Sequence, residues 1–218
     1  MHYFNLHTHK ATQNPNRIEL VNQYPNEFKD FFPYYSIGIH PWYIVEERVA
    51  SDLEIIEQQL QDPNCLALGE CGLDKRIAIP LQLQKLVFEQ QVRLAQQYNK
   101  PVVIHCVAAF QEVIAICKKM KLTVPLIIHG FSKNEIVAQS LIDNGFYLSF
   151  GKYLVQNPAL ASVFQKVPNH QLFLETDTLD AGIEAVYALA AHYKKISITE
   201  LQSQINQNSI QVFGLALD

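Results

Sequence analysis

Residues 102–105 read Val-Val-Ile-His, and residues 126–129 follow the same pattern as Leu-Ile-Ile-His. Each stretch is a short apolar run of strand length that ends abruptly in an imidazole. One such histidine is usually a satisfied core residue, but two of them, each preceded by three aliphatic residues, are hard to assign to chance. The pattern therefore predicts strands whose ends carry functional side chains.

Six further runs of apolar, β-branched or aromatic residues have the length of strands. Together the eight predicted strands cover about residues 3–8, 17–23, 35–39, 65–70, 101–105, 125–129, 146–150 and 171–176. Segments with helical periodicity separate them from the third strand onward. Capping-box spacing at Ser51, Ser132 and Ser197 predicts helix starts, and Gly145 and Gly214 suit helix ends.

This alternation of strands and helices predicts a parallel sheet. We expect an α/β fold of the (β/α)8 TIM-barrel type, formed by residues 1–218 as a single domain, because in a barrel the carboxyl ends of all strands meet at one mouth. An open sheet would place the outer strand ends too far apart to share a ligand. The connection from His9 to Arg17 is too short for a full helix, so we expect the first barrel helix to be missing.

The composition fits a globular protein with a large core. Hydrophobic residues make up 49% of the 218, and the formal net charge of −4 provides no basic field to attract nucleic acid over long range. The four cysteines lack the paired spacing of a structural zinc site, and no apolar stretch approaches the roughly 18 residues of a membrane span. We expect a cytoplasmic protein with reduced thiols, no membrane association and no obligate protein partner.

Metal-ligand residue types recur where the predicted strands end. His7 and His9, two apart on one strand, project from the same face, and Glu70 and Asp177 add carboxylates at two other strand ends. Imidazoles and carboxylates in this mixture suit zinc, manganese or magnesium. The predicted metal ligands are His7, His9, Glu70, His105, His129 and Asp177.

Two ions would explain the number of these ligands. His7, His9, Glu70 and Asp177 would hold one ion, and Glu70, His105 and His129 the other, with Glu70 bridging both. Two-metal sites hydrolyse substrates by activating a water between the ions, and Asp177 at its strand end suits the general base. Asp177 and Glu70 are therefore the predicted catalytic residues.

The order of these motifs resembles the TatD-type metal-dependent hydrolases, a family of the amidohydrolase superfamily of barrels. The resemblance covers nearly the whole chain and rests on Asn5-Leu6-His7-Thr8-His9, Gly38-Ile39-His40-Pro41-Trp42, Gly69-Glu70-Cys71-Gly72-Leu73-Asp74, Val103-Ile104-His105, His129-Gly130-Phe131-Ser132 and Leu174-Glu175-Thr176-Asp177. It implies a two-metal hydrolase whose relatives act as deoxyribonucleases, often as exonucleases that start at a DNA end. It also implies that Asp177 and Glu70 match the family's catalytic carboxylates, and that His40 contacts substrate.

Three departures concern substrate rather than metal. Asn5 stands where the family usually has aspartate, Cys106-Val107-Ala108 replaces a common Ser-Arg-Asp, and Thr178 follows Asp177 in place of serine. The missing arginine is a plausible phosphate ligand, because a guanidinium forks onto phosphate oxygens. Its loss weakens the inference to DNA.

Several other residues near the predicted mouth have two interpretations. His40 contacts substrate or packs against Trp42, and Lys133 and Lys152 meet a phosphate or face solvent. Asp74 orients a ligand histidine or has an ordinary turn role. Asn5 and Glu175 face inward as candidate supports behind the ligands, with the partner of Glu175 left open.

Three functions remain open from the sequence. The first is a phosphodiesterase or deoxyribonuclease acting on nucleic acid ends, and the second is a metal-dependent hydrolase of a small ester, amide or phosphate ester, which the missing arginine and the net charge suit better. The third is a non-catalytic binding protein that retains metal. Six retained ligand residues argue against the third, since a binding role needs no positioned Asp177.

Overall fold

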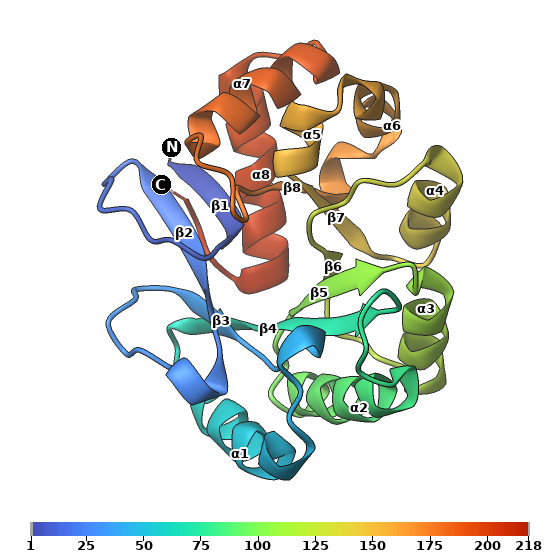
Figure 1. Cartoon of the computed structure of the whole chain (residues 1–218). Coiled ribbons are helices and arrows are strands. Elements are labelled where there is room, and N and C mark those ends of the chain that lie inside the picture. Colours follow the sequence, from blue (N-terminus) through green and yellow to red (C-terminus); the bar gives the residue numbers. More distant parts are fainter. Residues whose placement is uncertain (1, 218) are drawn as a thin grey trace. The chain divides into compact units, whose positions relative to one another are not determined.

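The computed structural model describes residues 2–217 and contains the eight predicted strands. They are β1 Tyr3–Thr8, β2 Arg17–Gln23, β3 Tyr35–Ile37, β4 Cys65–Asp74, β5 Val102–Val107, β6 Leu126–Ile128, β7 Tyr147–Phe150 and β8 Leu172–Leu174 (Figure 1). β4 is longer than its predicted range, because it continues beyond Glu70 as far as Asp74, whereas β3, β6 and β8 are shorter, with three residues each.

Helices follow the strands from β3 onward. They are α1 Val49–Gln59, α2 Leu81–Gln97, α3 Phe110–Lys119, α4 Glu135–Asp143, α5 Lys152–Gln156, α6 Ala161–Lys166, α7 Ile183–Lys194 and α8 Ile198–Phe213. Short 3-10 turns precede several of them, among them η2 Pro41–Tyr43 and η3 Glu46–Arg48. The connection between β1 and β2 contains no helix, as predicted, and the one between β2 and β3 contains only the 3-10 turn η1 Pro25–Glu27.

The strands form one sheet in the sequential order β1 to β8. β1 pairs with β2, β3 with β4, β4 with β5 and β7 with β8, each in parallel, and a parallel bridge joins Thr8 to Asp177 directly after β8. Sequential parallel strands whose first and last members adjoin have the topology of a (β/α)8 barrel. The predicted fold class is confirmed, including the missing first helix.

Two compact units make up the chain. The first contains the chain as far as Val21 together with the chain from Ile128 onward, and the second is Asn22–Ile127. In the first unit, α7 and α8 pack against β1, and the Tyr187 hydroxyl donates to the Phe4 carbonyl at 3.1 Å (Figure 1). In the second, α2 packs against β4 with the side chains of Gln84 and Gln91 buried. The single-domain assignment stays a prediction.

Helix capping follows the sequence at one of three predicted serines. Ser197 forms the capping box of α8, with its side chain accepting from the Glu200 amide. Ser51 lies inside α1, because the turn η3 starts that helix earlier, and its hydroxyl donates to the Arg48 carbonyl at 2.9 Å. At α4 the cap is Asn134, which accepts from the Val137 amide, so the predictions at Ser51 and Ser132 are wrong.

Within residues 2–217, no helix is both long and apolar enough to cross a membrane.

Candidate metal centres

The second unit brings His40, Glu70 and His105 together. Glu70 Oε1 lies 2.9 Å from His105 Nδ1 and 3.2 Å from His40 Nε2. The three side chains each offer a ligand atom, and these atoms lie within 4.8 Å of one another. The Glu70 carboxylate is nearly fully buried, at 3% exposed. We call these three residues the inner donor group.

Close backbone packing and buried amides fix this inner donor group. A side chain at Gly38 would come within 2.9 Å of the Glu70 carbonyl oxygen, so the approach of β4 to the end of β3 requires glycine there. Asn22 Oδ1 accepts from the Glu70 amide at 2.7 Å. Gln91 holds both backbone groups of Ile39, directly before His40, at 2.7 and 3.1 Å.

Asp74 supports His105 from the other side of the ring. Its Oδ2 accepts from Trp42 Nε1 at 2.7 Å and lies 3.6 Å from His105 Nε2. Burial alone would raise the pKa of the Asp74 carboxyl, but the hydrogen bonds from Trp42 and from the Arg76 amide hold it below the usual range. Asp74 is therefore an anion, a suitable partner for an imidazole that binds a cation.

The first unit brings His7, His9 and Asp177 together. Their ligand atoms also lie within 4.8 Å of one another, and His9 Nε2 is 3.4 Å from Asp177 Oδ1. The His9 and Asp177 side chains are 28% and 19% exposed. We call these three residues the outer donor group.

The backbone around Asp177 is held by β1. The Asp177 amide donates to the His7 carbonyl at 2.9 Å, and Asp177 has a left-handed φ of 52°. Asn5 is buried on β1, where its Nδ2 donates to Thr176 Oγ1 at 2.8 Å and its Oδ1 accepts from the Thr176 amide at 2.9 Å. An amide can make both bonds at once because it is donor and acceptor, whereas an ionised aspartate only accepts.

His129 lies beside this outer donor group in the same unit. Its ring centre is 4.4 Å from that of His7, and its Nδ1 is 3.5 Å from Glu175 Oε1. Glu175 is fully buried, and the same oxygen accepts from the Gly130 amide at 2.7 Å. Glu175 thus contacts both the histidine and the backbone that follows it.

The two lysines differ in their contacts. Lys152 Nζ donates to the hydroxyl of Thr178, the residue after Asp177, at 3.1 Å, so it lies beside the outer donor group. Lys133 is half-buried in the segment between His129 and α4. Their roles toward substrate stay predictions.

Sequence reasoning placed His40 with substrate, whereas the structure places its ring nitrogen against the Glu70 carboxylate. The signal was present, because Ser36-Ile37-Gly38-Ile39 is another apolar run that ends in histidine. Sequence reasoning gave no role to Asn22, Gln84 or Gln91, which hold backbone groups near the inner donor group. A spacing of seven residues puts both glutamines on one helix face.

The chemistry of both groups fits divalent ions. Each combines two imidazoles with one carboxylate, a donor set that suits zinc, manganese and related ions. Buried or half-buried carboxylates next to histidines are costly without a cation. His40, Glu70 and His105 would hold one ion, and His7, His9 and Asp177 another.

A barrel with such donor sets at its strand ends has the features of a metal-dependent hydrolase. The sequence model of a family described as TatD related DNase matches residues 2–214. The chain therefore belongs to this family of metal-dependent hydrolases.

Curated relatives carry matching descriptions. A metal-dependent hydrolase of Haemophilus influenzae is 34% identical over 68% of this chain and 60% of its own length. The hydrolase YabD of Bacillus subtilis is 32% identical over 91% of this chain and 82% of its own length. The 3'-5' ssDNA/RNA exonuclease TatD of Edwardsiella piscicida is 29% identical over 76% and 64%. The chain thus spans less than two thirds of the Haemophilus and Edwardsiella proteins.

Solved structures confirm the fold. The TatD homologue YJJV of Escherichia coli K12 has a TM-score of 0.86 at 20% identity, covering 98% of both chains. A TatD-family hydrolase of Entamoeba histolytica has a TM-score of 0.79 at 14% identity.

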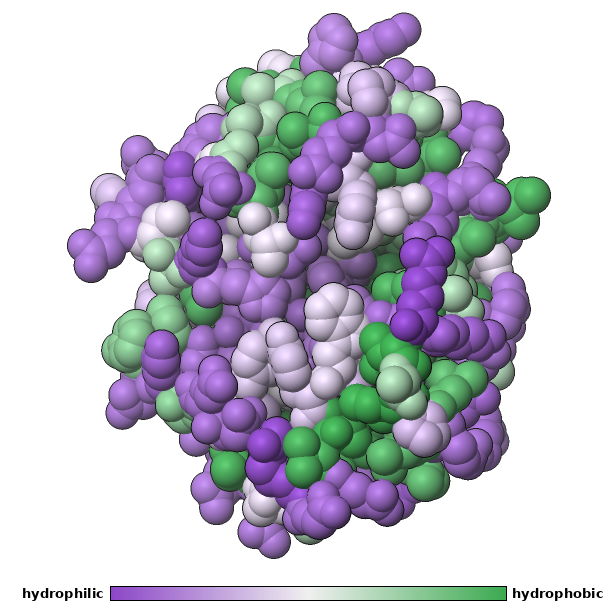
Figure 2. Space-filling view, in the orientation of Figure 1, coloured by the Kyte–Doolittle hydropathy of each residue, from purple (hydrophilic) through white to green (hydrophobic). Residues whose placement is uncertain are grey.

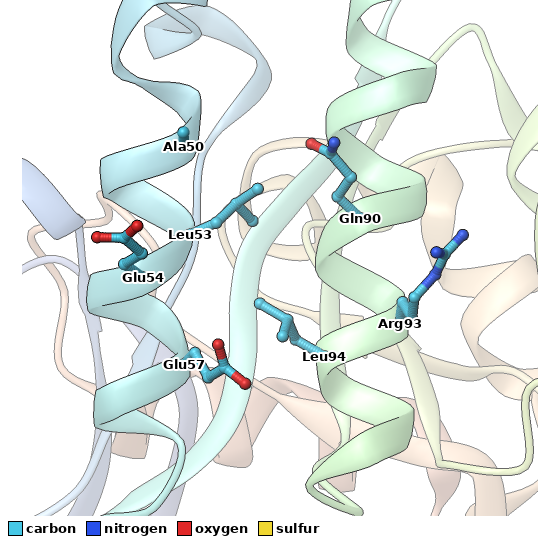
Figure 3. Close-up of a pocket in the computed structure, with 7 residues that line it drawn as sticks. All are labelled: Ala50, Leu53, Glu54, Glu57, Gln90, Arg93 and Leu94. Atoms are coloured by element: carbon cyan, nitrogen blue, oxygen red, sulfur yellow. The ribbon is translucent and has the colours of Figure 1, made fainter.

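A pocket lies between α1 and α2 (Figure 3). Leu53 and Leu94 face each other across it, with Glu57 and Arg93 also among its lining residues. Its lining residues belong to neither donor group.

Proposed function

We propose that this protein is a two-metal phosphodiesterase that removes nucleotides from the ends of nucleic acid, a deoxyribonuclease in the broad sense. The observation that carries the proposal is the pair of donor groups, each with two imidazoles and one carboxylate within 4.8 Å. Ions bound there would supply Lewis acidity toward a phosphoryl oxygen and a nucleophile at neutral pH.

The residues divide the remaining work. The Asp177 side chain is 19% exposed, and its carboxylate accepts the proton of the attacking water as general base. Glu70 is buried and keeps two imidazoles around one of its oxygens. Asp74 and Glu175 orient His105 and His129, and Lys152 beside Thr178 meets a phosphate of the substrate as a point charge.

The nucleic acid substrate draws support from one relative, which is described as a 3'-5' ssDNA/RNA exonuclease. A hydrolase of small esters, amides or phosphate esters is the second candidate. Two observations favour it: the net charge of −4, and the absence of arginine from Cys106-Val107-Ala108 after His105.

A substrate panel with metal-depleted and reloaded protein separates these candidates. The protein is reloaded with zinc, manganese or magnesium and given linear single-stranded DNA, the same DNA as a closed circle, a model phosphodiester and a model carboxylic ester. We expect release of nucleotides from the linear strand and little cleavage of the circle. Turnover of the ester alone contradicts the nuclease proposal, and equal cleavage of the circle contradicts attack at ends.

The cysteines support the predicted cytoplasmic location. Cys65, Cys71 and Cys117 are free thiols, and these three and Cys106 are all buried. Burial raises the pKa of both Cys65 and Cys117 to about 12, so these thiols stay protonated and unreactive. Thiols buried and protonated in this way suit a reducing compartment.

A further inference from the structure

An exposed aromatic pair borders the inner donor group. Trp42 and Tyr43 form the turn η2 directly after His40, and they are 53% and 48% exposed. Side chains of intermediate hydropathy gather over this turn in the space-filling view (Figure 2). Large aromatic residues normally bury most of their surface, so a half-exposed tryptophan beside candidate metal ligands invites a functional explanation.

Trp42 is fixed in place rather than loosely exposed. Its indole Nε1 donates to Asp74 Oδ2 at 2.7 Å, and its ring meets those of His40 and His105 edge to face at 5.2 and 6.0 Å. A ring held by a hydrogen bond at one edge loses little further freedom when a ligand covers its open surface. Such preorganisation favours binding.

The other oxygen of the same carboxylate holds the backbone of a basic residue, Arg76. The Arg76 amide donates to Asp74 Oδ1 at 2.8 Å, and the Arg76 side chain is exposed. Its neighbour Lys75 is engaged with Glu112 at 2.5 Å, but among the residues described here no acidic group pairs with Arg76. Asp74 thus accepts hydrogen bonds from the indole of Trp42 and from the backbone of Arg76, whose guanidinium is exposed.

We propose that Trp42 is a stacking platform for the terminal base of a single-stranded nucleic acid, and that Arg76 contacts the adjoining phosphate. Bases stack on aromatic side chains irrespective of sequence, and guanidinium groups bind phosphate oxygens in pairs. This inference deepens the proposed function and rests on it for the identity of the substrate. It assigns the recognition of that substrate to the second unit.

The chain carries its own reporter for this contact. Trp42 is its sole tryptophan, so intrinsic tryptophan emission reports on this position alone. Metal-depleted protein with chelator present is titrated with a short single-stranded oligothymidylate, and anisotropy of a labelled copy measures binding separately. We expect saturable quenching with the same midpoint as the anisotropy change, and no quenching by an abasic strand of equal length.

Variants separate the two contacts. Trp42→Leu should weaken oligonucleotide binding at least about tenfold. Arg76→Gln should weaken it severalfold and reduce the slope of log affinity against log salt by about one. Phe31→Leu is the matched control, because Phe31 is an exposed aromatic of the same unit, at 69%, whose ring contact is with Phe32. Circular dichroism and thermal melting verify that each variant is folded.

The outcomes separate this inference from the nuclease proposal. Binding without a change in Trp42 emission, wild-type affinity in Trp42→Leu, or no binding by metal-depleted protein overturns the platform, since neither contact requires an ion. If the reloaded enzyme still degrades single-stranded DNA in that case, the nuclease proposal stands alone. Quenching without hydrolysis under any of the three metals keeps the platform and rejects the nuclease.

Discussion

The two donor groups contain the same side chain types but are held differently. In the inner donor group, Glu70 lies within a central strand, is 3% exposed and has both imidazoles against one oxygen. In the outer donor group, Asp177 follows a strand, is 19% exposed and touches His9 at 3.4 Å. A buried carboxylate between two imidazoles suits permanent ligation, whereas a partly exposed one can also exchange protons. Under our proposal, the inner donor group therefore has a structural role in metal binding, and the outer donor group transfers protons.

The largest expected effect separates these two roles. Asp177→Asn should lower the hydrolysis rate by about 10²–10⁴, because a general base is lost while size and shape are kept. Ion binding at the inner donor group should persist. Single-turnover rates and metal content of the same preparation measure both. Wild-type turnover in Asp177→Asn on every substrate would remove the general base from the scheme.

Metal stoichiometry should distinguish the groups next. His9→Ala and His105→Ala each remove one imidazole from one group, so each variant should retain about one ion where the wild type binds about two. The double variant should bind neither tightly. Equilibrium dialysis followed by elemental analysis gives the number of bound ions per chain. His192→Ala is the control, because His192 lies on α7 outside both groups. A wild type that saturates at one ion contradicts the two-metal assignment.

Supporting amides should have smaller, local effects. Asn5→Ala removes two hydrogen bonds to Thr176, and Asn22→Ala removes one to the Glu70 amide. Each loss should weaken metal binding about 10–100-fold at its own group only. Leaving the partners unsatisfied should also lower unfolding free energy by about 1–3 kcal/mol. Each variant is titrated with metal in a protein whose other donor group has been disabled by its histidine-to-alanine change. Equal weakening of metal binding at both groups would contradict a local effect.

The smallest effect concerns one ion pair in each unit. In the first, burial raises the pKa of Glu184, but the hydrogen bonds from Arg17 at 2.8 Å, a backbone hydrogen bond and the Arg17 charge together lower it below its usual value. In the second, the hydrogen bond from Lys75 lowers the pKa of Glu112. A carboxyl with a lowered folded pKa stabilises the protein above its unfolded pKa of about 4.3, and this contribution is lost as pH falls through the folded value.

Glu184→Gln and Glu112→Gln should therefore each be slightly less stable than wild type at pH 7, and the gap should close in acid. Urea unfolding from pH 7 into the acidic range gives the unfolding free energies of wild type and variants for this comparison. A gap that widens on acidification would contradict the assigned pKa directions.

Strand positions were predictable because strand ends in this chain coincide with abrupt changes from aliphatic to polar residues. His129 illustrates this, since it directly follows the aliphatic strand β6, whereas β5 continues past His105 to Val107. Helix starts were less predictable, because the capping residue depends on the position and direction of the turn before the helix. At α1 the 3-10 turn η3 makes Arg48 the N-cap, three residues before Ser51. The run before His40 indicated a strand end, but its contact with Glu70 depends on close packing at Gly38, a tertiary approach that this local pattern does not specify.

The left-handed backbone at Asp177 limits which residues can replace it. Asparagine and glycine adopt this conformation readily, whereas β-branched residues do so only with strain. A saturation library at this position, scored for folded protein rather than activity, should therefore retain aspartate, asparagine and glycine and lose valine, isoleucine and threonine. Backbone geometry would then limit which amino acids position 177 accepts, independently of any requirement for catalysis.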